Sequence, residues 1–523
     1  MRERSSPLSV DPARRRWLRG ALAVAGLGMS GAIARVAAPT GFGDDPFSLG
    51  VASGDPSEDG FVIWSRLAPR PLQIGGGMDP IDRVVHWEVS DDHQFRRIVK
   101  NGTTLARTRR AHAVHVDVRG LAAGRVYHYR FHCAGAVSAT GRAKTLPAAL
   151  LPADRLRFVV ASCQHYEHGW FAAHRHIAAS DVDFVLHLGD YIYEGSYGER
   201  VRRFESTAAL QNLDDYRARH ACYKLDPDLQ AAHAACAWLP IWDDHEVGND
   251  YAGDLAMDGE SLSQFALRRA AAYRAWLEHM PVRAALREDD TRIFRRLRFG
   301  ALAELHLLDD RQYRAPQPCA PRDRGYAPMI DVSCVERDDA QRSLLGTAQE
   351  GWLLDGLGAG GARWNLLGQQ TLIAPLVSHT DEREEVWSDA WDGYTATRQR
   401  LLDRIAEARI PNVVSFGGDV HAFYANDLKR NFDDTHSAAI ASEFVTGSLT
   451  TDDVDHDAVL RDLPRNPHVR AFESRWRGWL DCDLGPERLD LRWQMLSDAR
   501  DPLATTRTFR QFSVVHGQPG VQA

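Results

Sequence analysis

The hydrophobic and polar positions divide the chain into a β-rich first part and a mixed second part. Between residues 47 and 146, short runs either alternate apolar with polar residues or are β-branched, and turns separate them. Such runs predict β-strands. With no helical pattern between them, they indicate a β-sandwich of about 100 residues. The predicted strands are 61–64, 83–89, 112–118 and 126–131.

From residue 156 the pattern changes to strands that alternate with helices. A buried-strand run, a helical stretch and a second strand follow one another within residues 157–188. This order predicts a strand–helix–strand unit with parallel pairing. Further strands are predicted at 235–242, 301–308, 364–367 and 412–416, and helices at 261–277, 347–357 and 398–408. We therefore expect an N-terminal β-sandwich domain at 39–146, a linker at 147–152 and a large α/β domain at 153–516.

The first residues of the chain predict an export signal. Arginines at positions 14–16 precede an apolar run over residues 20–33 that is short and rich in glycine. A basic segment followed by a short apolar one is typical of a signal peptide, and this run is too short for a comfortable membrane span. The segment resembles a twin-arginine signal, although Ala13 stands where serine or threonine is usual; an ordinary secretory signal is the alternative.

We accordingly assign residues 1–38 to a twin-arginine-type signal peptide. This predicts a periplasmic or secreted protein that uses the twin-arginine export machinery and has no stable membrane span after cleavage. Residues 1–38 hold seven arginines against two acidic residues, so the rest of the chain is more acidic than the net charge of −8. An acidic body would repel phosphate esters unless metal ions dominate the local field.

Seven cysteines are present, and no two of them form a CxxC pair, so a zinc ribbon is not expected. An odd number in an exported chain leaves at least one unpaired. Cys319 and Cys334 flank a polar loop that a disulfide would staple, with two free thiols as the alternative. We expect Cys163 to be unpaired, because it belongs to a cluster of candidate metal ligands.

Metal-ligand residue types follow four of the predicted strands. Ligands in open α/β sheets gather beyond the carboxyl ends of strands, so these positions are expected to lie close together. The four clusters are Ser162-Cys163-Gln164, Asp190-Tyr191-Ile192-Tyr193-Glu194, Asp243-Asp244-His245-Glu246 with Asn249 nearby, and Gly417-Gly418-Asp419-Val420-His421.

Each cluster by itself has a structural alternative. An aspartate after a glycine is often a turn residue, Asp243 and Asp244 are candidates for a helix cap, and a lone cysteine is usually just buried. Four clusters at strand ends are harder to explain in this way. An Asp-Asp-His-Glu run at the end of a buried strand needs a cation or strongly shifted pKa values.

In this order the clusters resemble those of the PhoD-like alkaline phosphatases, which belong to the calcineurin-like metallophosphoesterases. The similarity extends to Leu-Asp-Asp-Arg-Gln-Tyr-Arg at 308–314 and to Leu-Gly-Val-Ala-Ser-Gly-Asp-Pro at 49–56, and it covers nearly all of the chain after the signal. It implies an α/β fold, a four-layer αββα metallophosphoesterase sandwich preceded by an N-terminal β-sandwich. It also implies hydrolysis of phosphomonoesters and phosphodiesters by a metal-bound water, hydroxide or oxo species.

The resemblance further implies the ligands of a first metal ion. Carried over by motif, these are Cys163, Asp190, Tyr193 and His421, with Asp190 bridging to a second region. Thiolate, carboxylate, phenolate and imidazole together suit Fe³⁺, which prefers anionic ligands.

The second region is bounded by Asp190, Asp244, Asn249 and Asp419. It offers carboxylate and amide oxygens without sulfur, a set that suits Ca²⁺. Whether Asp244, Asn249 or both bind the ion stays open at this point.

We assign His245, Asp244 and Arg311 to catalysis. His245 is a candidate for protonating the leaving oxygen or clamping phosphate; orienting a ligand is the alternative. Arg311 and Arg314 either hold a phosphate or form structural ion pairs.

The nearest rival is a phosphodiesterase with the same fold and metals, of a phospholipase-D-like kind that acts on lipid head groups or cell-wall polymers. A non-catalytic surface binding protein is a different class, and the intact ligand set argues against it. The chain has no GxSxG sequence, which argues against an α/β-hydrolase. Net acidity and the lack of a basic stripe argue against a nucleic-acid partner. We expect a monomer that acts on a phosphate-ester substrate.

Overall fold

The computed structural model describes residues 42–198, 200–257, 259–287, 290–321, 326–379, 383–452 and 454–522. The signal peptide predicted at 1–38 lies outside these residues, so export and cleavage stay predictions. Within the described ranges, no helix combines the length and the apolar character needed to cross a membrane.

Ten strands form the larger of two core sheets. Its central strands β9, β10 and β11 pair in parallel, as the strand–helix–strand pattern predicts. The order across this sheet is β25 (Gln518–Gln522), β24 (Thr506–Val515), β23 (Arg488–Leu496), β22 (Gly478–Leu484), β9 (Leu156–Ala161), β10 (Phe184–His187), β11 (Ala237–Pro240), β1 (Val51–Ser57), β2 (Gly60–Arg66) and β5 (Ala113–Val118).

Seven strands form the second core sheet. Its middle strands β13, β15, β18 and β20 are parallel to one another. Its order is β12 (Arg295–Phe299), β13 (Ala303–Leu307), β15 (Trp364–Gly368), β18 (Val413–Gly417), β20 (Ala439–Val445), β19 (Phe423–Lys429) and β21 (Val469–Glu473). A small sheet of β14 (Met329–Asp331), β17 (Glu384–Trp387) and β16 (Val377–His379) lies apart from it in the hydrogen-bonding order.

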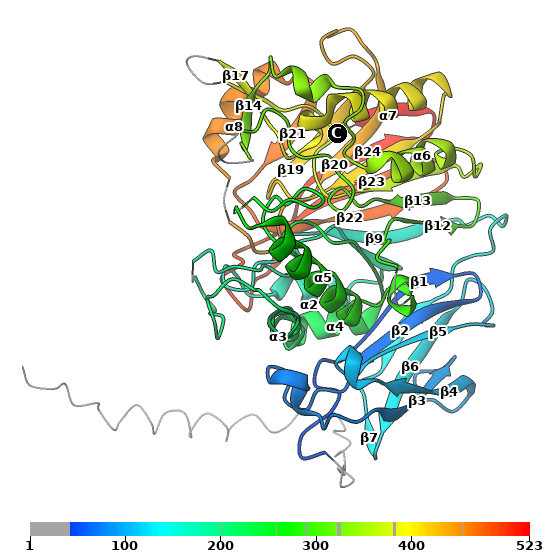
Figure 1. The fold of residues 1–523 in the computed structure, drawn as a ribbon. Coiled ribbons are helices and arrows are strands. Elements are labelled where there is room, and N and C mark those ends of the chain that lie inside the picture. The colour runs from blue at the N-terminus through cyan, green and yellow to red at the C-terminus, as the bar shows by residue number, and fades with distance from the viewer. Residues whose placement is uncertain are drawn as a thin grey trace, which may run out of the picture. The chain divides into compact units, whose positions relative to one another are not determined.

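The two core sheets pack face to face and helices cover their outer faces (Figure 1). Phe158 of β9 meets Phe416 of β18 edge to face at 5.5 Å between ring centroids, and Phe184 of β10 stacks on Phe299 of β12 at 5.2 Å. The first sheet is covered by α2 (Ala172–Ala179), α3 (Leu213–Lys224), α4 (Pro227–Ala235) and α5 (Leu262–His279), and the second by α6 (Gly346–Gly356) and α7 (Thr395–Glu407). A short helix, α8 (His456–Asp462), precedes β21. The four-layer αββα arrangement is thereby confirmed.

The β-rich first part of the chain shares a sheet with the rest of the molecule. Strand β1 pairs in parallel with β11, so β1, β2 and β5 continue the larger core sheet. The second layer of the N-terminal sandwich is a separate sheet of β4 (Ile98–Ala106), β3 (Arg83–Ser90), β6 (Val126–Cys133) and β7 (Ala136–Val137), with β8 (Gly141–Lys144) paired to β6. Phe61 and Ile63 of β2 pack against Tyr129 and Phe131 of β6 between the two layers. The hydrogen-bonded ladder therefore crosses the boundary expected at residues 147–152.

Five buried histidines lie between the helices and the larger sheet. Their rings stack on one another or on tryptophan: His220 lies 5.0 Å from His279, and His233 lies 3.9 Å from Trp238. Burial lowers the pKa of all five, to about 3 for His174 and well below the usual value for the others: His187, His220, His233 and His279. They are therefore neutral in the folded protein at every pH near 7.

These lowered pKa values predict a loss of stability in mild acid. The unfolded chain binds a proton at each histidine below about pH 6.5, whereas the folded protein does not, so the free energy of unfolding falls as the pH drops through that value. Both ring nitrogens of His220 are buried without a hydrogen-bond partner among the described residues, so a phenyl ring can replace its imidazole without breaking such a bond.

We expect His220→Phe to have near wild-type stability at pH 7.5 and to lose about 1.4 kcal/mol less than the wild type on transfer to pH 5.5. Urea unfolding at the two pH values measures the difference. An unchanged pH dependence in the variant would show that His220 titrates normally in the folded state.

Candidate metal centre

Strand ends from both core sheets meet at one cluster of side chains. Cys163 follows β9, Asp190 follows β10, Asp244 follows β11, and Asp419 and His421 follow β18. Potential ligand atoms form three groups among the described residues, and the atoms within each group lie within 4.8 Å of one another. The groups are Cys163 with Asp190 and His421; Asp190 with Asp244 and His245; and Asp190 with Asp243, Asp244 and Asp419. Asp190 belongs to all three groups, so it lies at the centre of the cluster.

Four of the clustered residues have a left-handed backbone. The φ angles are 58° at Cys163, 54° at Asp190, 64° at Asp419 and 52° at His421. Residues other than glycine adopt this conformation rarely, and aspartate and histidine adopt it more often than cysteine does. Such strained residues concentrate at functional sites, where the surrounding structure holds them in place.

Gly189 lets two of the strand ends approach closely. Its φ is 106°, and a Cβ atom on it would lie 2.3 Å from the Cβ of Asp243. No residue with a side chain fits there without moving the β11 end, so the glycine permits Asp190 and Asp243 to lie side by side.

Two buried side chains outside the predicted set fix the loops. The carboxylate of Glu246 accepts the backbone N–H groups of Asp190, Tyr191 and Asp243 at 3.1, 2.7 and 2.7 Å, which joins the β10 and β11 ends. Gln370, just beyond β15, donates to the carbonyls of Trp242 and Leu308, which joins the two sheets. Glu246 thus positions the site and belongs to no candidate ligand group among the described residues.

Tyr193 forms the sulfur side of the centre together with Cys163 and His421. Its hydroxyl donates to Asp190 Oδ2 at 2.9 Å, and it lies 3.2 Å from His421 Nε2 and 2.9 Å from Thr451 Oγ1. Burial, and after it the charge of Asp190, raises the pKa values of Cys163 and Tyr193 well above their usual range. Both groups therefore keep their protons unless a cation compensates their charge.

The carboxylate side has more negative charge than the protein neutralises. Asp190 Oδ1, Asp243 Oδ2 and Asp244 Oδ1 are buried without a hydrogen-bond partner among the described residues. Burial raises the pKa values of Asp243 and Asp419 well above the usual range, against the opposing charge of Arg311. Buried carboxylate oxygens that lack donors fit cations, because a cation satisfies their lone pairs and their charge together.

Arg311 is enclosed by aspartates. Its side chain is 1% exposed; Nε lies 2.5 Å from Asp243 Oδ1, Nη2 lies 3.1 Å from Asp419 Oδ2, and Nη1 donates to Asp389. Arg314 Nη1 donates to the other oxygen of Asp389 at 2.8 Å. Both arginines thus have acidic partners within the protein, which agrees with the ion-pair alternative for them.

His245 is oriented by a buried carboxylate. Its Nδ1 lies 2.7 Å from Glu194 Oε2, while Glu194 Oε1 accepts the backbone N–H of Asn249 at 2.9 Å. Burial lowers the pKa of His245, but the charges of Asp244 and Glu194 outweigh it and hold that pKa well above its usual value. Asn249 is itself exposed, and its recorded contact is this backbone bond, so a metal-binding role for its amide stays a prediction.

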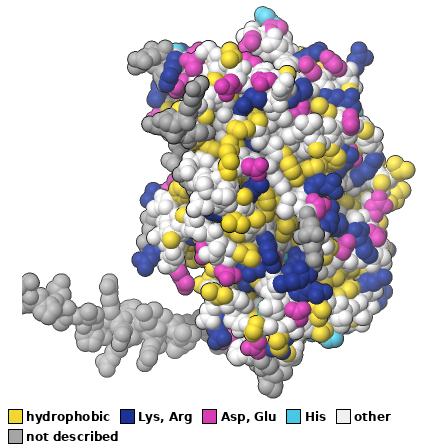
Figure 2. All heavy atoms as spheres, viewed as in Figure 1, with side chains coloured by type: hydrophobic (Ala, Val, Ile, Leu, Met, Phe, Trp, Pro, Cys, Tyr) yellow, Lys and Arg dark blue, Asp and Glu magenta, His cyan; other side chains and the backbone are white. Residues whose placement is uncertain are grey.

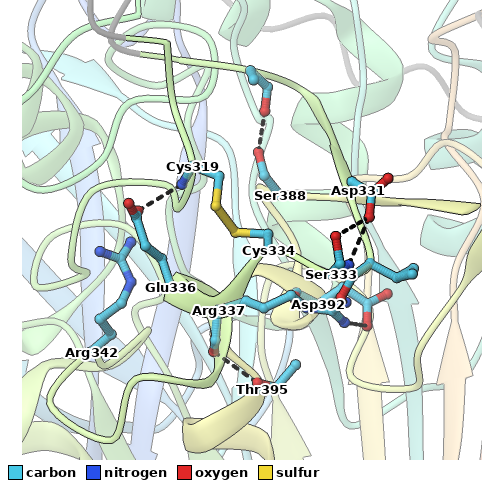
Figure 3. Close-up of a disulfide and its surroundings, with 12 residues drawn as sticks. Cys319, Asp331, Ser333, Cys334, Glu336, Arg337, Arg342, Ser388, Asp392 and Thr395 are labelled. Carbon is cyan, nitrogen blue, oxygen red and sulfur yellow. Dashed lines mark hydrogen bonds and ion pairs between the residues drawn. A yellow bond between two sulfur atoms is a disulfide. The ribbon is translucent and has the colours of Figure 1, made fainter. Parts of the chain in front are cut away.

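A disulfide-closed loop lies next to the aspartates. Cys319 and Cys334 are bonded, which confirms the stapled loop, and the amide of Cys319 donates to Glu336 at 2.7 Å (Figure 3). Just before the bridge, Gln317 Nε2 donates to Asp389 Oδ1 at 2.7 Å. Cys163 is free, as expected for a ligand.

Comparison with known proteins gives a consistent result. The model of the PhoD-like phosphatase family matches residues 158–493, and that of the PhoD-like phosphatase N-terminal domain matches residues 33–147. The chain belongs to the PhoD-like phosphatase family. It is 40% identical over 528 residues to alkaline phosphatase D of Bacillus subtilis (strain 168), covering 97% of this chain and 88% of the relative. A solved structure titled "Structure of PhoD" superposes with a TM-score of 0.87 at 40% identity and 93% coverage of both chains.

This PhoD-like phosphatase is therefore a phosphoesterase hydrolase, and its fold gathers residues of the types that bind metal ions. Of the predicted ligands, the structure brings together Cys163, Asp190, Tyr193, Asp244, Asp419 and His421. Asp243 was absent from the prediction and lies among the clustered carboxylates. The signal that points to it is its place beside Asp244 at a strand end, where a helix cap is an equally good interpretation.

The ion pairs of Arg311 predict a structural role in this phosphatase. Arg311→Gln leaves Asp243 buried without its cation and removes one of the two arginines bound to Asp389, so we expect the metal-free protein to lose roughly 3–5 kcal/mol of unfolding free energy. Urea unfolding measures the loss, with the exposed Arg510→Gln as control. Unchanged stability combined with a raised KM for a phosphate ester would instead identify Arg311 as a substrate clamp.

Proposed function

We propose that this PhoD-like phosphatase hydrolyses phosphomonoesters and phosphodiesters with Fe³⁺ and Ca²⁺. The observation that carries the proposal is the set of three buried carboxylate oxygens, on Asp190, Asp243 and Asp244, that have no hydrogen-bond partner among the described residues. Cations bound there would cancel the charge of the substrate's phosphate and lower the pKa of a bound water. Residues of the chain would bind these ions and protonate the leaving oxygen.

Cys163, Asp190, Tyr193 and His421 are proposed to hold Fe³⁺. Tyr193 Oη lies within 3.2 Å of both His421 Nε2 and Asp190 Oδ2, so one ion can contact all three side chains without rearrangement of the loops. Thiolate and phenolate are soft or strongly basic anions, and they favour a highly charged transition-metal ion over Ca²⁺.

The oxygen-only region is proposed to hold Ca²⁺. Asp190, Asp244 and Asp419 contribute carboxylates, Asp243 is added from its position among them, and Asn249 remains a candidate through its amide. Such ligands suit the flexible oxygen coordination of Ca²⁺. Arg311 lies against the same aspartates, so it would complete the positive side of this region.

His245 is proposed to protonate the leaving oxygen. Because Nδ1 bonds to Glu194, Nε2 is the ring atom left to face a substrate. Glu194 Oε1 accepts hydrogen bonds from Tyr197 Oη at 3.0 Å and from the backbone N–H of Asn249 at 2.9 Å. Because these bonds fix Glu194, the imidazole of His245 has one orientation. A fixed donor at the leaving group stabilises the charge that develops on it.

We also propose that the protein is exported. The proposal rests on the arginines at 14–16 and the apolar run at 20–33. Fractionation of cells that express the full chain, compared with a variant in which lysines replace the three arginines, tests this location independently of activity.

Replacing the bridging carboxylate tests the function. Asp190→Ala removes the one residue common to all three ligand groups, so we expect metal content to fall and hydrolysis of p-nitrophenyl phosphate and bis-p-nitrophenyl phosphate to drop to background. Elemental analysis and the paired assays measure both effects, with Arg510→Gln as a surface control. Full metal content and normal turnover in Asp190→Ala would contradict the proposed site.

Replacing the phenol tests the metal. A phenolate bound to Fe³⁺ gives a visible charge-transfer band, so concentrated wild-type protein should be coloured and Tyr193→Phe should be bleached. Only one oxygen is lost, and the stability cost should stay near 1 kcal/mol. A colourless wild-type protein that contains zinc alone would rule out iron in this position.

A further inference from the structure

Three adjoining hollows on the described surface are lined by arginines. The first, of about 470 Å³, has six arginines in its lining: Arg283, Arg287, Arg292, Arg295, Arg296 and Arg298. A second hollow of about 520 Å³ shares Arg287 with it, and a third of about 670 Å³ shares Arg292 and Phe294. The shared residues place the three hollows next to one another beside the edge strand β12, and we call them together the arginine groove. Figure 2 shows Lys and Arg side chains gathered on this face, on the side where Figure 1 places β12.

Part of this positive charge is not neutralised by the protein. The lining of the first hollow contains two acidic residues, Asp55 and Glu58, against the six arginines. Four of the six arginines are paired with carboxylates: Arg295 with Asp55 at 2.7 Å, Arg283 with Asp117 at 3.0 Å, Arg287 with Asp290 at 3.0 Å and Arg296 with Glu304 at 3.9 Å. Arg292 and Arg298 have no carboxylate within ion-pair distance among the described residues; Arg298 Nε donates to backbone carbonyls instead. These two guanidinium groups are therefore a local cationic feature on a chain with a net charge of −8.

Aromatic rings lie between the arginines. Phe294 is 5.1 Å from Trp352 and 5.9 Å from Tyr313, measured between ring centroids. The guanidinium of Arg296 lies over Trp352 at 4.8 Å, and that of Arg292 lies over Phe294 at 5.7 Å. Arginines interleaved with aromatic rings offer both partners that a nucleotide chain needs, a cation for each phosphate and a flat surface for each base.

One loop connects the third hollow with a hollow that contains a partner of His245. The third hollow is walled by Gly253 and Leu255, and the next residues along that loop, Ala256 and Met257, line a further hollow of about 490 Å³. Glu194, the partner of His245, lines this last hollow together with Asn249. The third hollow and the hollow of Glu194 therefore share this loop as a wall.

We propose that this groove binds single-stranded nucleic acid, with phosphates on Arg292 and Arg298 and bases stacked near Phe294 and Trp352. The absence of a basic stripe was an expectation from the linear sequence. The fold assembles one from residues 109–110, 269–274 and 283–298. The aromatic rings favour a nucleotide chain over a plain polyphosphate or an anionic membrane, neither of which offers bases to stack.

Binding of a labelled phosphorothioate DNA oligonucleotide to the metal-loaded protein tests the proposal. The double variant Arg292→Gln/Arg298→Gln orphans no carboxylate of the described residues, and we expect its Kd to rise at least about tenfold. Each lost phosphate contact should reduce the slope of log K against log salt by about 0.7. The matched control is Arg507→Gln on β24, whose guanidinium lies over Trp476 at 4.8 Å, outside the groove. Its Kd should equal that of the wild type.

Phe294→Leu separates stacking from charge. We expect it to weaken DNA binding several-fold and to leave the binding of inorganic polyphosphate unchanged. Equal loss of both ligands, no loss of either, or binding of phosphatidylglycerol vesicles without binding of DNA would overturn the proposal, as would unaltered DNA binding in the double arginine variant. Thermal unfolding midpoints confirm that each variant is folded. Hydrolysis of p-nitrophenyl phosphate by the wild type tests the proposed function separately, because DNA binding does not depend on turnover.

Discussion

Mutual repulsion among buried carboxylates is the constraint on which this structure depends. Asp190, Asp243, Asp244 and Asp419 offer oxygens within 4.8 Å of one another, and all four side chains are buried. Arg311 lies directly among them, and His245, whose pKa is raised, lies beside Asp190 and Asp244. One guanidinium and one imidazolium cannot neutralise four carboxylates, so the cluster either keeps protons or binds metal cations.

The fold provides the rigidity that such a cluster requires. Like charges move apart unless other interactions prevent it. Here the hydrogen bonds between two side chains and the backbone of the strand ends prevent it. Glu246 joins the ends of β10 and β11, and Gln370 joins those of β11 and β13. Cys163 and Asp419 have a left-handed backbone, which the surrounding structure must hold in place. The loops therefore have little freedom to move apart. A preformed arrangement of this kind costs little reorganisation when substrate binds.

Much of the fold and most of the candidate site could be predicted from the sequence. Buried parallel strands have continuous apolar runs, and residues such as Asp190 and Asp419 are conspicuous because they follow those runs directly. Glu246 and Gln370 could not be assigned in this way, since their partners are backbone groups brought near only by folding. The strands after β18 were not predicted, and one of them, β22, pairs with β9 from more than 300 residues earlier in the chain. The arginine groove was missed because residues distant in the sequence form it.

The ladder between β1 and β11 has a consequence for how the molecule can be divided. Ser53 and Gly54 of β1 pair with Ala237 and Trp238 of β11, so the first 150 residues supply the strand that covers this edge of the catalytic sheet. A shortened protein that begins at the linker would present β11 as an open, apolar edge. Open edges of this kind recruit strands from other molecules, so such a fragment would tend to aggregate. The N-terminal part is thus better regarded as a permanent cover for the β11 edge of this sheet than as a separable domain.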